Sequence, residues 1–354
     1  MYSSVTVAGG SLLKRLADNP PSQTQWPSAV ATFVFIADFV VFLPVILILV
    51  YTLSNVYPTL AAVEDPLPDY EAVPMNDDGT PKTDNDPVSA AQPGKPITGS
   101  LRATNALIRS RGGWLANFRG LGYAVLVQII VALTAVFLAL APFIPFRIAH
   151  LIALLAAAPL ATTWTHLVIT PPSTKSFFRR IPSLKKVYVA AWFPTFLFWA
   201  AVQASVLFPE LLGRGIGLCM RDPNNPDKIC DQPKDGSYLA KVIAVAGLSL
   251  ALQVLLAIPA HAALARVQAS LLPADEDPIV PFDRSFAGRV EPEVVTGKGF
   301  ATFGAAIKTI PRSSWLRIYL LRVKVFFVSV GAYFVMGTIV GLEVLVMGLI
   351  SAGK

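Results

Sequence analysis

The fold is decided by one stretch, Thr170–Lys186, with the sequence TPPSTKSFFRRIPSLKK. It contains five basic residues and no acid, and an apolar run of membrane-spanning length lies on each side of it. Short basic loops between membrane spans stay on the cytosolic side of the bilayer. We therefore expect residues 170–186 to form a cytosolic loop that orients the two spans beside it.

The composition of the whole chain points the same way. Of the 354 residues, 54% are hydrophobic and only 14% are charged, whereas soluble domains carry roughly 25% charged residues. In lipid, backbone polar groups must be satisfied within the segment, so each span has to be helical. The sequence predicts an all-α, polytopic integral membrane protein.

The net charge of +7 bears on the partners of the chain. Because the basic residues lie beside apolar runs, we expect them to meet the anionic headgroups of the lipid bilayer and not nucleic acid. Two cysteines and three histidines are too few for a Cys/His zinc cluster or an iron–sulfur centre, so we predict no metal and no cofactor.

Six apolar runs have close to the ~20 residues that a transmembrane helix needs. Pro44, Pro159, Pro194 and Pro259 lie inside these runs, where we expect kinks that neighbouring groups can compensate. The six predicted transmembrane helices cover residues 29–53, 121–143, 147–169, 187–208, 239–265 and 325–351.

The connectors between these runs agree on one orientation. Residues 101–119 and 308–324 are basic and contain no acid, like the loop 170–186, whereas loop 209–237 has four basic and five acidic residues. The basic connectors therefore face the cytosol. The short segment 1–28, the loop 209–237 and the C-terminal end of 325–354 then lie on the lumenal or extracellular side.

Two longer connectors lie on the predicted cytosolic side. Residues 59–100 are rich in proline and acid, a composition that buries too little apolar surface to fold, so we predict a disordered linker. In the second connector, 266–324, apolar residues recur at helical spacing over 299–310 and predict an amphipathic helix that lies on the membrane. We also expect interfacial basic helices before the second and the sixth span.

Small residues at four-residue spacing predict where the helices pack closely. One ridge lies in the third span, and a second lies in the sixth span, where it could pack within the chain or against a second copy. The two ridges are Ala149, Ala153 and Ala157, and Gly337, Gly341 and Gly348.

Two acids, Asp38 and Glu343, lie inside apolar spans at similar depth, and Lys241 begins the fifth span on the same side. A charge in the hydrocarbon is costly unless it is paired, protonated or hydrated. We interpret these residues as a buried polar group that locks helices together. The alternative is an intramembrane site that binds a cation or a proton.

Two cysteines, Cys219 and Cys230, lie in the loop 209–237. An oxidising lumenal location favours a disulfide between them, which would contribute on the order of 3 kcal/mol by constraining the unfolded chain. Two free thiols are the alternative.

The linker contains the sequence PLPDYEAV at residues 66–73. Leu67, Pro68 and Tyr70 form an LPxY pattern that resembles a variant of the PPxY ligands of WW domains in Nedd4-type ubiquitin ligases. A proline pre-sets the extended polyproline conformation that a WW groove accepts. The resemblance implies a WW-domain partner, with Lys82 and Lys95 as nearby ubiquitin acceptors.

No nucleotide-binding loop, catalytic triad signature or metalloprotease motif is found in the sequence. We therefore expect a non-enzymatic adaptor or accessory subunit of a membrane complex; the alternative is a small-solute or proton-coupled transporter.

Residues 1–28 lack the charged start, apolar core and cleavage site of a signal peptide, so we expect no cleaved signal peptide there. The disulfide and the orientation favour a secretory-pathway membrane such as the endoplasmic reticulum, with the mitochondrial inner membrane as a minor alternative.

Overall fold

The computed structural model describes residues 29–65, 96–173, 180–218, 236–290 and 299–352, and these residues form helices and loops without strands. Most helices are α-helical; η1 and η5 are π-helical, and η2 and η3 are 3-10 turns. In chain order the elements are α2 (Ala29–Leu47), η1 (Ile48–Val56), α3 (Tyr57–Val63), η2 (Ile97–Gly99), α4 (Leu101–Gly112), η3 (Trp114–Phe118), α5 (Leu121–Ala139), α6 (Phe146–Ala156), α7 (Ala158–Ile169), α8 (Leu184–Gly215), α9 (Gly236–Leu252), η5 (Gln253–Ala257), α10 (Ile258–Ser270), α11 (Phe303–Lys308) and α12 (Arg312–Ala352).

Five helical stretches of the described chain are long and apolar enough to cross a membrane, which is consistent with an integral membrane protein. The predicted third span, 147–169, is not one straight helix, because α6 and α7 meet at a bend of 58°. Pro159 occupies the first turn of α7, where its missing N–H ends the hydrogen-bond ladder of α6. If the bent pair counts as one span, the total is six. The five stretches are Thr32–Val63, Leu115–Ala139, Leu184–Gly215, Gly236–Ser270 and Arg312–Met347.

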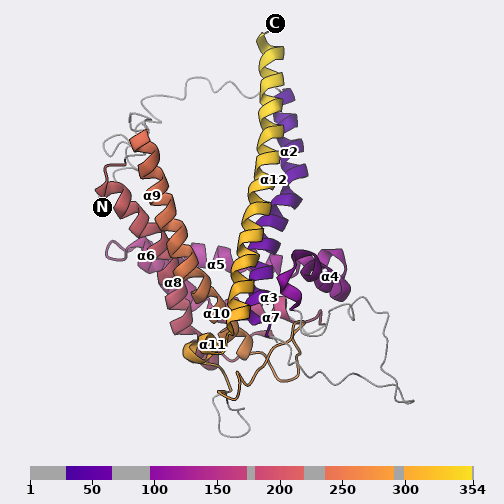
Figure 1. Ribbon diagram of the computed structural model, residues 1–354, viewed down its shortest axis with the longest axis vertical. Helices are drawn as coiled ribbons and strands as arrows, with labels where there is room; N and C mark the ends of the chain where they lie inside the picture. Colours follow the sequence, from indigo (N-terminus) through magenta and orange to yellow (C-terminus); the bar gives the residue numbers. More distant parts are fainter. Residues whose placement is uncertain (1–28, 66–95, 174–179, 219–235, 291–298, 353–354) are drawn as a thin grey trace, which may run out of the picture.

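The helices form two arms that diverge from a common base (Figure 1). One arm pairs α2 with α12, and the other pairs α8 with α9. We call the end where α3, α7, α10 and the first turns of α12 meet the base of the bundle. The start of α2, the ends of α12 and α8 and the start of α9 all lie away from the base.

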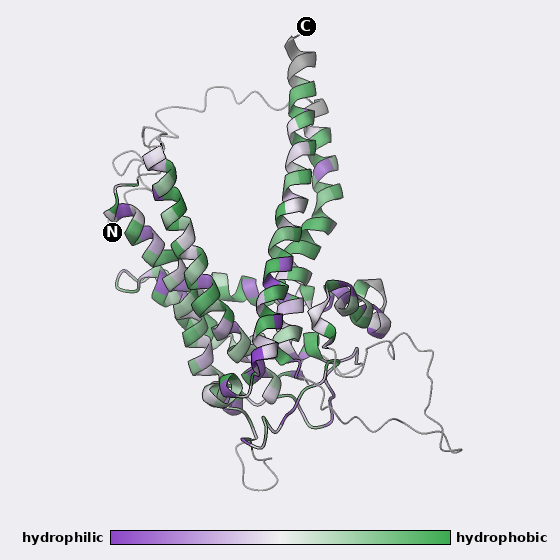
Figure 2. Ribbon diagram, in the orientation of Figure 1, coloured by the Kyte–Doolittle hydropathy of each residue, from purple (hydrophilic) through white to green (hydrophobic). Residues whose placement is uncertain are grey.

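Hydrophobic residues predominate along both arms (Figure 2). Phe33 and Phe334 of the α2–α12 arm are each more than 70% exposed, and so is Phe137 of α5. A protein in water rarely exposes so much apolar surface, so lipid is the solvent that suits these arms. The main core lies at the base instead, where Leu60, Val63 and other side chains of α3 pack against α7, α10 and α12.

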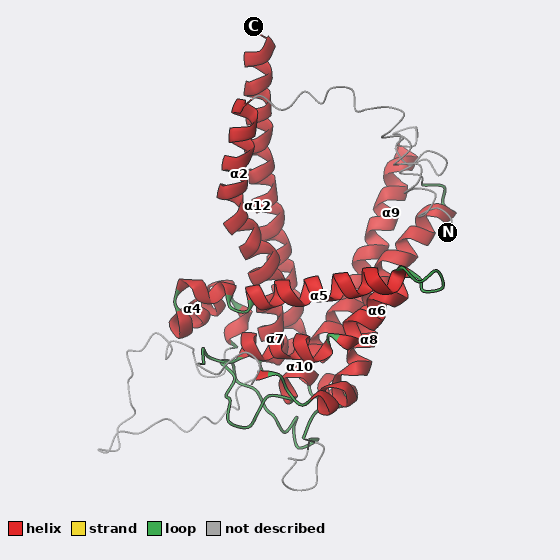
Figure 3. Ribbon diagram, turned by 180° about the vertical axis from the view of Figure 1, so that it is seen from behind, coloured by secondary structure: helices red, strands yellow, loops and turns green. Residues whose placement is uncertain are grey.

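The alanine ridge of α6 confirms one predicted packing surface. Ala149, Ala153 and Ala157 are buried, and the ridge packs against Val131 and Ala135 of α5. The view from behind shows α5 and α6 running side by side across the two arms (Figure 3). Small side chains let the two backbones approach closely, as the spacing predicted.

The glycine ridge of α12 behaves differently. A methyl group placed on Gly337 or Gly341 would meet no atom within 4 Å among the described residues. The prediction that these two glycines pack inside the chain is therefore wrong, and packing against another chain stays a prediction. Gly348 lies farther along the same helix.

The predicted disordered linker, residues 59–100, is too long at both ends. α3 continues to Val63, and residues 59–64 are buried at the base. At the other end, Ile97–Gly99 forms η2 and Ser100 caps α4. The composition argument counted Glu64 as a solvated acid, whereas the structure buries it against an arginine. The rest of the predicted linker, residues 66–95, lies outside the described residues.

The predicted membrane-surface helix 299–310 is also corrected. Only Phe303–Lys308 is helical, and its apolar side packs on protein: Ala301 and Ala306 are fully buried against Val267 and Phe286. No separate interfacial helix precedes the sixth span, because α12 runs without a break from Arg312. The basic helix predicted before the second span is present as α4.

Candidate functional site

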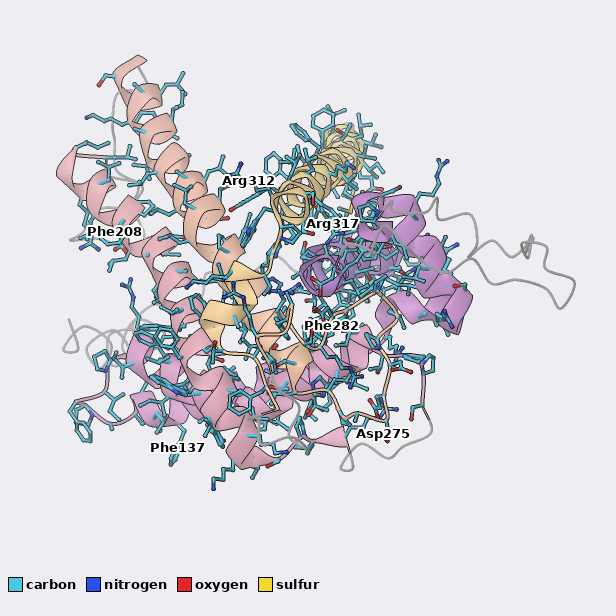
Figure 4. All side chains as sticks on the ribbon, turned by 60° about the horizontal axis from the view of Figure 1, so that its bottom comes forward. Phe137, Phe208, Asp275, Phe282, Arg312 and Arg317 are labelled. Carbon is cyan, nitrogen blue, oxygen red and sulfur yellow. The ribbon has the colours of Figure 1, made fainter. Side chains whose placement is uncertain are left out.

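Four charged residues meet at the base of the bundle, and we call them the charge cluster: Glu64, Asp65, Arg266 and Arg317. Glu64 and Asp65 follow the last turn of α3, Arg266 comes from α10 and Arg317 from α12. Arg317 and Phe282 lie at this base in Figure 4, which turns the base toward the viewer. Arg266 is 1% exposed, Glu64 2% and Arg317 6%, so these charges are held away from solvent.

The cluster consists of two ion pairs. Arg317 Nη1 lies 3.0 Å from Glu64 Oε2, and Arg266 Nη1 lies 2.7 Å from Asp65 Oδ1. Burying a charge costs several kcal/mol per ion, and only good geometry with further hydrogen bonds offsets this cost. The hydrogen bonds that these side chains make to other groups therefore decide how stable the charge cluster is.

Backbone carbonyls at the end of α3 supply some of these bonds. Arg317 Nη2 donates to the carbonyls of Ala61 at 3.3 Å and Glu64 at 2.6 Å, and Arg266 Nη1 donates to that of Ala62 at 3.4 Å. The last carbonyls of a helix have no partner inside it, and they form the negative end of its dipole. Two arginines at this end satisfy both the hydrogen bonds and the charge.

The carboxylate of Glu64 also joins two distant parts of the chain. It accepts hydrogen bonds from the backbone N–H of Ile97 at 2.7 Å and of Thr98 at 3.0 Å, and from the Thr98 hydroxyl. The chain leaves the base at Asp65 and returns at residue 96. A single buried side chain therefore holds together the two ends of segment 66–95, and we call this contact the linker clasp.

Residues 279–288 close the other side of the cluster. The backbone N–H of Asp65 donates to the Pro281 carbonyl at 2.8 Å, and Asp65 Oδ2 accepts from the N–H of Asp283 at 2.9 Å. The guanidinium of Arg266 lies 5.8 Å from the ring centre of Phe282 and 5.1 Å from that of Phe286. A cation over an aromatic face is stabilised by the ring quadrupole, most strongly away from water.

The backbone is strained where it positions Phe286. Phe286 and Ala287 have φ angles of 51° and 54°, a region that side chains with a Cβ seldom adopt. Asp283 compensates, because its carboxylate accepts from the backbone N–H groups of Ser285 and Ala287 at 2.8 and 2.7 Å. Burial raises the pKa of Asp283, but these hydrogen bonds and the Arg266 charge outweigh it and hold the pKa below its usual value.

Two further side chains of α12 donate to backbone carbonyls in the π-helical stretches. Arg322 Nη1 donates to the carbonyl of Ser54, near the end of η1, at 3.2 Å. Pro259 lies five residues after Val254, the spacing of the π-helical stretch η5, and the Tyr319 hydroxyl donates to the Val254 carbonyl at 3.2 Å. Helix α12 is thus hydrogen-bonded to the backbone of two neighbouring helices.

The structure brings together two of the three residues predicted to form an intramembrane polar site. The carboxyls of Asp38 on α2 and Glu343 on α12 lie close enough to each other to interact. Two negative charges side by side in an apolar surrounding are costly, so a proton held between the carboxyls would stabilise the pair. Lys241 lies on α9, in the other arm (Figure 1).

The remaining predicted site residues lie outside the described residues: Cys219 and Cys230, and Leu67, Pro68 and Tyr70. Within the described part of the chain, no group of three or more histidine, cysteine, aspartate or glutamate residues is placed to hold a metal ion.

The sequence did not predict the charge cluster. The sequence alone places Arg317 in the basic connector 308–324, and Glu64 and Asp65 in the linker 59–100. The available signal was the position of all four charges at the ends of apolar runs, where a charge is held by a partner or by water. The comparisons with known proteins add nothing to this site: no protein-family model, curated protein or solved structure matches the chain.

Proposed function

We propose that this chain is a non-enzymatic, multi-pass membrane protein that acts as an adaptor or accessory subunit. In this role the base of the bundle is a rigid platform that holds segment 66–95 out for a cytosolic partner. The observation that carries the proposal is the linker clasp, in which Glu64 bonds the backbone at Ile97 and Thr98.

The clasp serves this role because it fixes where the segment leaves and returns. Asp65 is held through both its backbone and its side chain, to Pro281, Asp283 and Arg266. The LPxY pattern at residues 67–70 begins two residues after this anchor. A ligand motif placed next to a rigid anchor loses less freedom on binding than one far along a chain, which favours its capture.

The membrane orientation supports a cytosolic position for the platform. The three basic connectors, 101–119, 170–186 and 308–324, all adjoin helices that start or end at the base. We infer that the base faces the cytosol, that the α6–α7 pair makes the sixth span, and that both termini are lumenal or extracellular. With a disulfide between Cys219 and Cys230, this arrangement fits a secretory-pathway membrane, the endoplasmic reticulum first.

One observation favours a second candidate, a proton-coupled or small-solute transporter. The neighbouring carboxyls of Asp38 and Glu343 form a titratable site in the apolar part of the bundle. A carrier that moves protons needs such a site within its spans. The same pair equally serves to hold α2 against α12, and the adaptor proposal needs nothing more of it.

The proposal is tested by affinity purification of the full chain from native membranes in mild detergent. We compare the wild type with Tyr70→Ala and with the control Met75→Ala, which changes the same segment outside the pattern. A WW-domain ligase recovered with the wild type and the control, but not with Tyr70→Ala, supports the proposal. Equal recovery by all three excludes the motif. A wild type that purifies without partners favours the transporter, and uptake assays with Asp38→Asn and Glu343→Gln then follow.

A further inference from the structure

Arg322 of α12 is a positive charge that no acid offsets. It lies within Arg312–Met347, a stretch long and apolar enough to cross a membrane. Its Nη1 donates to the Ser54 carbonyl, and its Nε is shielded from solvent and makes no hydrogen bond. The Nε groups of Arg266 and Arg317 are unbonded too, but each of those guanidiniums pairs with a carboxylate. Arg322 makes no ion pair within the part of the chain that the structure describes. A charge held in such a place needs a partner or water.

The helices around Arg322 do not supply that partner. Arg322 reaches η1 through Ser54. One turn earlier on the same face of α12, the Tyr319 hydroxyl donates to the carbonyl of Val254 in η5. η1, η5 and α10 contain no aspartate or glutamate, and the one acid of α12, Glu343, lies near the other end of that helix. The counter-ion of Arg322 therefore comes from outside these helices.

His261 of α10 is a hydrogen-bond donor in the same region. Its ring is close enough to Arg322 to be acted on by the arginine charge, and it packs edge-on against Phe198 of α8, with 5.6 Å between the ring centres. A neutral imidazole carries one N–H donor. Arg322 and His261 are both only partly buried, so this region can be reached from outside the chain.

The backbone on both sides of this region is irregular. η1 and η5 are π-helical, and both are hydrogen-bonded to one face of α12, through Arg322 and Tyr319. Stretches of π-helix are rare in proteins and are frequently found at functional sites. The backbone geometry therefore marks the same place as the unbalanced charge does.

We propose that Arg322 binds an oxyanion, a carboxylate or a phosphate group, with His261 as a second donor. The planar guanidinium presents parallel N–H groups that match the two oxygens of such a group. A small soluble anion and a lipid headgroup offer Arg322 the same chemistry. In the transporter of the second candidate function, this anion is the substrate. The site itself requires neither a WW-domain partner nor the Asp38–Glu343 pair.

The test measures the unfolding temperature of the purified full-length protein in detergent. Inorganic phosphate and succinate are compared with sodium chloride at equal ionic strength, and dioctanoyl phosphatidic acid is compared with dioctanoyl phosphatidylcholine. The variants are Arg322→Gln, which removes the charge, and Arg322→Lys, which keeps the charge without the parallel donors. The control is Arg312→Gln, which removes an exposed arginine at the start of the same helix.

We expect at least one probe to raise the unfolding temperature of the wild type and of Arg312→Gln above its reference, and Arg322→Gln to lose this response. Arg322→Lys should need roughly tenfold more of the probe for the same rise, because a charge-assisted hydrogen bond is lost. This second comparison decides the matter if Arg322→Gln does not fold.

The active probe identifies the source of the anion. A response to phosphate or succinate shows a soluble anion, and a response to phosphatidic acid alone shows a lipid headgroup. No rise with any probe, or an equal rise in Arg322→Gln, would overturn the proposal. Neither result bears on the Tyr70→Ala experiment.

Discussion

The Glu64 carboxylate lies 3.0 Å from Arg317 across 253 residues of sequence, and both side chains are almost completely buried. The pair ties the end of the first membrane helix to the start of the last. A buried charge that loses its partner is left without water to replace it, so the energetic consequence of breaking this pair is large.

Glu64→Gln should therefore lower the free energy of unfolding by about 3–5 kcal/mol, the usual cost of breaking a buried ion pair. Unfolding of the detergent-solubilised protein, followed by circular dichroism, measures it. The matched control is Glu210→Gln on α8, whose pairs with Arg147 and Arg214 are exposed, and which should cost at most about 1 kcal/mol. Equal effects of the two changes would contradict the role given to the clasp.

Asp283 predicts a dependence on acid pH. Its pKa in the folded protein lies below the value of 3.8 that it has when unperturbed. The ionised carboxylate therefore stabilises the fold at all pH values above 3.8, and this contribution is lost as the pH falls through the lower, folded-state pKa. Unfolding temperatures at a series of acid pH values should fall more steeply for the wild type than for Asp283→Asn. Parallel curves would mean that the hydrogen bonds to Asp283 do not stabilise the strained turn.

The Asp38–Glu343 carboxyl pair should tolerate neutral replacements. Asp38→Asn with Glu343→Gln keeps a donor and an acceptor, so the free energy of unfolding should change little. Asp38→Leu leaves Glu343 without its partner in an apolar surrounding and should destabilise the fold more. If the double variant is the less stable of the two, a charge and not a hydrogen bond holds α2 to α12.

The two small-residue ridges should respond in opposite ways to a larger side chain. Ala153→Leu places three extra carbons in the contact between α5 and α6 and should destabilise the chain by about 1–3 kcal/mol. Gly337→Leu meets open space and should leave unfolding of the monomer unchanged. Chemical crosslinking in native membranes then checks the remaining alternative: if α12 dimerises through its glycines, Gly337→Leu abolishes the dimer.

Much of the helical architecture follows from local sequence, because a membrane span must be apolar and helical whatever its neighbours are. The sequence therefore predicts the apolar runs of α2, α5, α8, α9 and α12, and the burial of Ala149 and Ala153. The bend between α6 and α7 was anticipated only as a kink at Pro159. Its size, 58°, depends on how α7 packs against α3, α8 and α10.

The charge cluster could not be found in this way, because its members are separated by up to 253 residues. Local composition describes Glu64 as one acid among many and Arg317 as an interfacial cation. Only the folded chain shows that each is the other's counter-ion. Likewise, the apolar positions of 299–310 indicated a surface to bury, but the periodicity is the same whether lipid or α10 covers it.

The linker clasp makes the membrane bundle independent of the chain that runs between residues 66 and 95. The closure is made by the folded base, and lengthening a closed loop twofold costs only about 0.6 kcal/mol. A protease cut in this segment would leave two fragments that remain bound through Glu64, Asp65 and the arginines. The first helix and the rest of the bundle could thus be produced as separate polypeptides and still reassemble, and the segment between them is free to vary in length and content while the bundle keeps its shape.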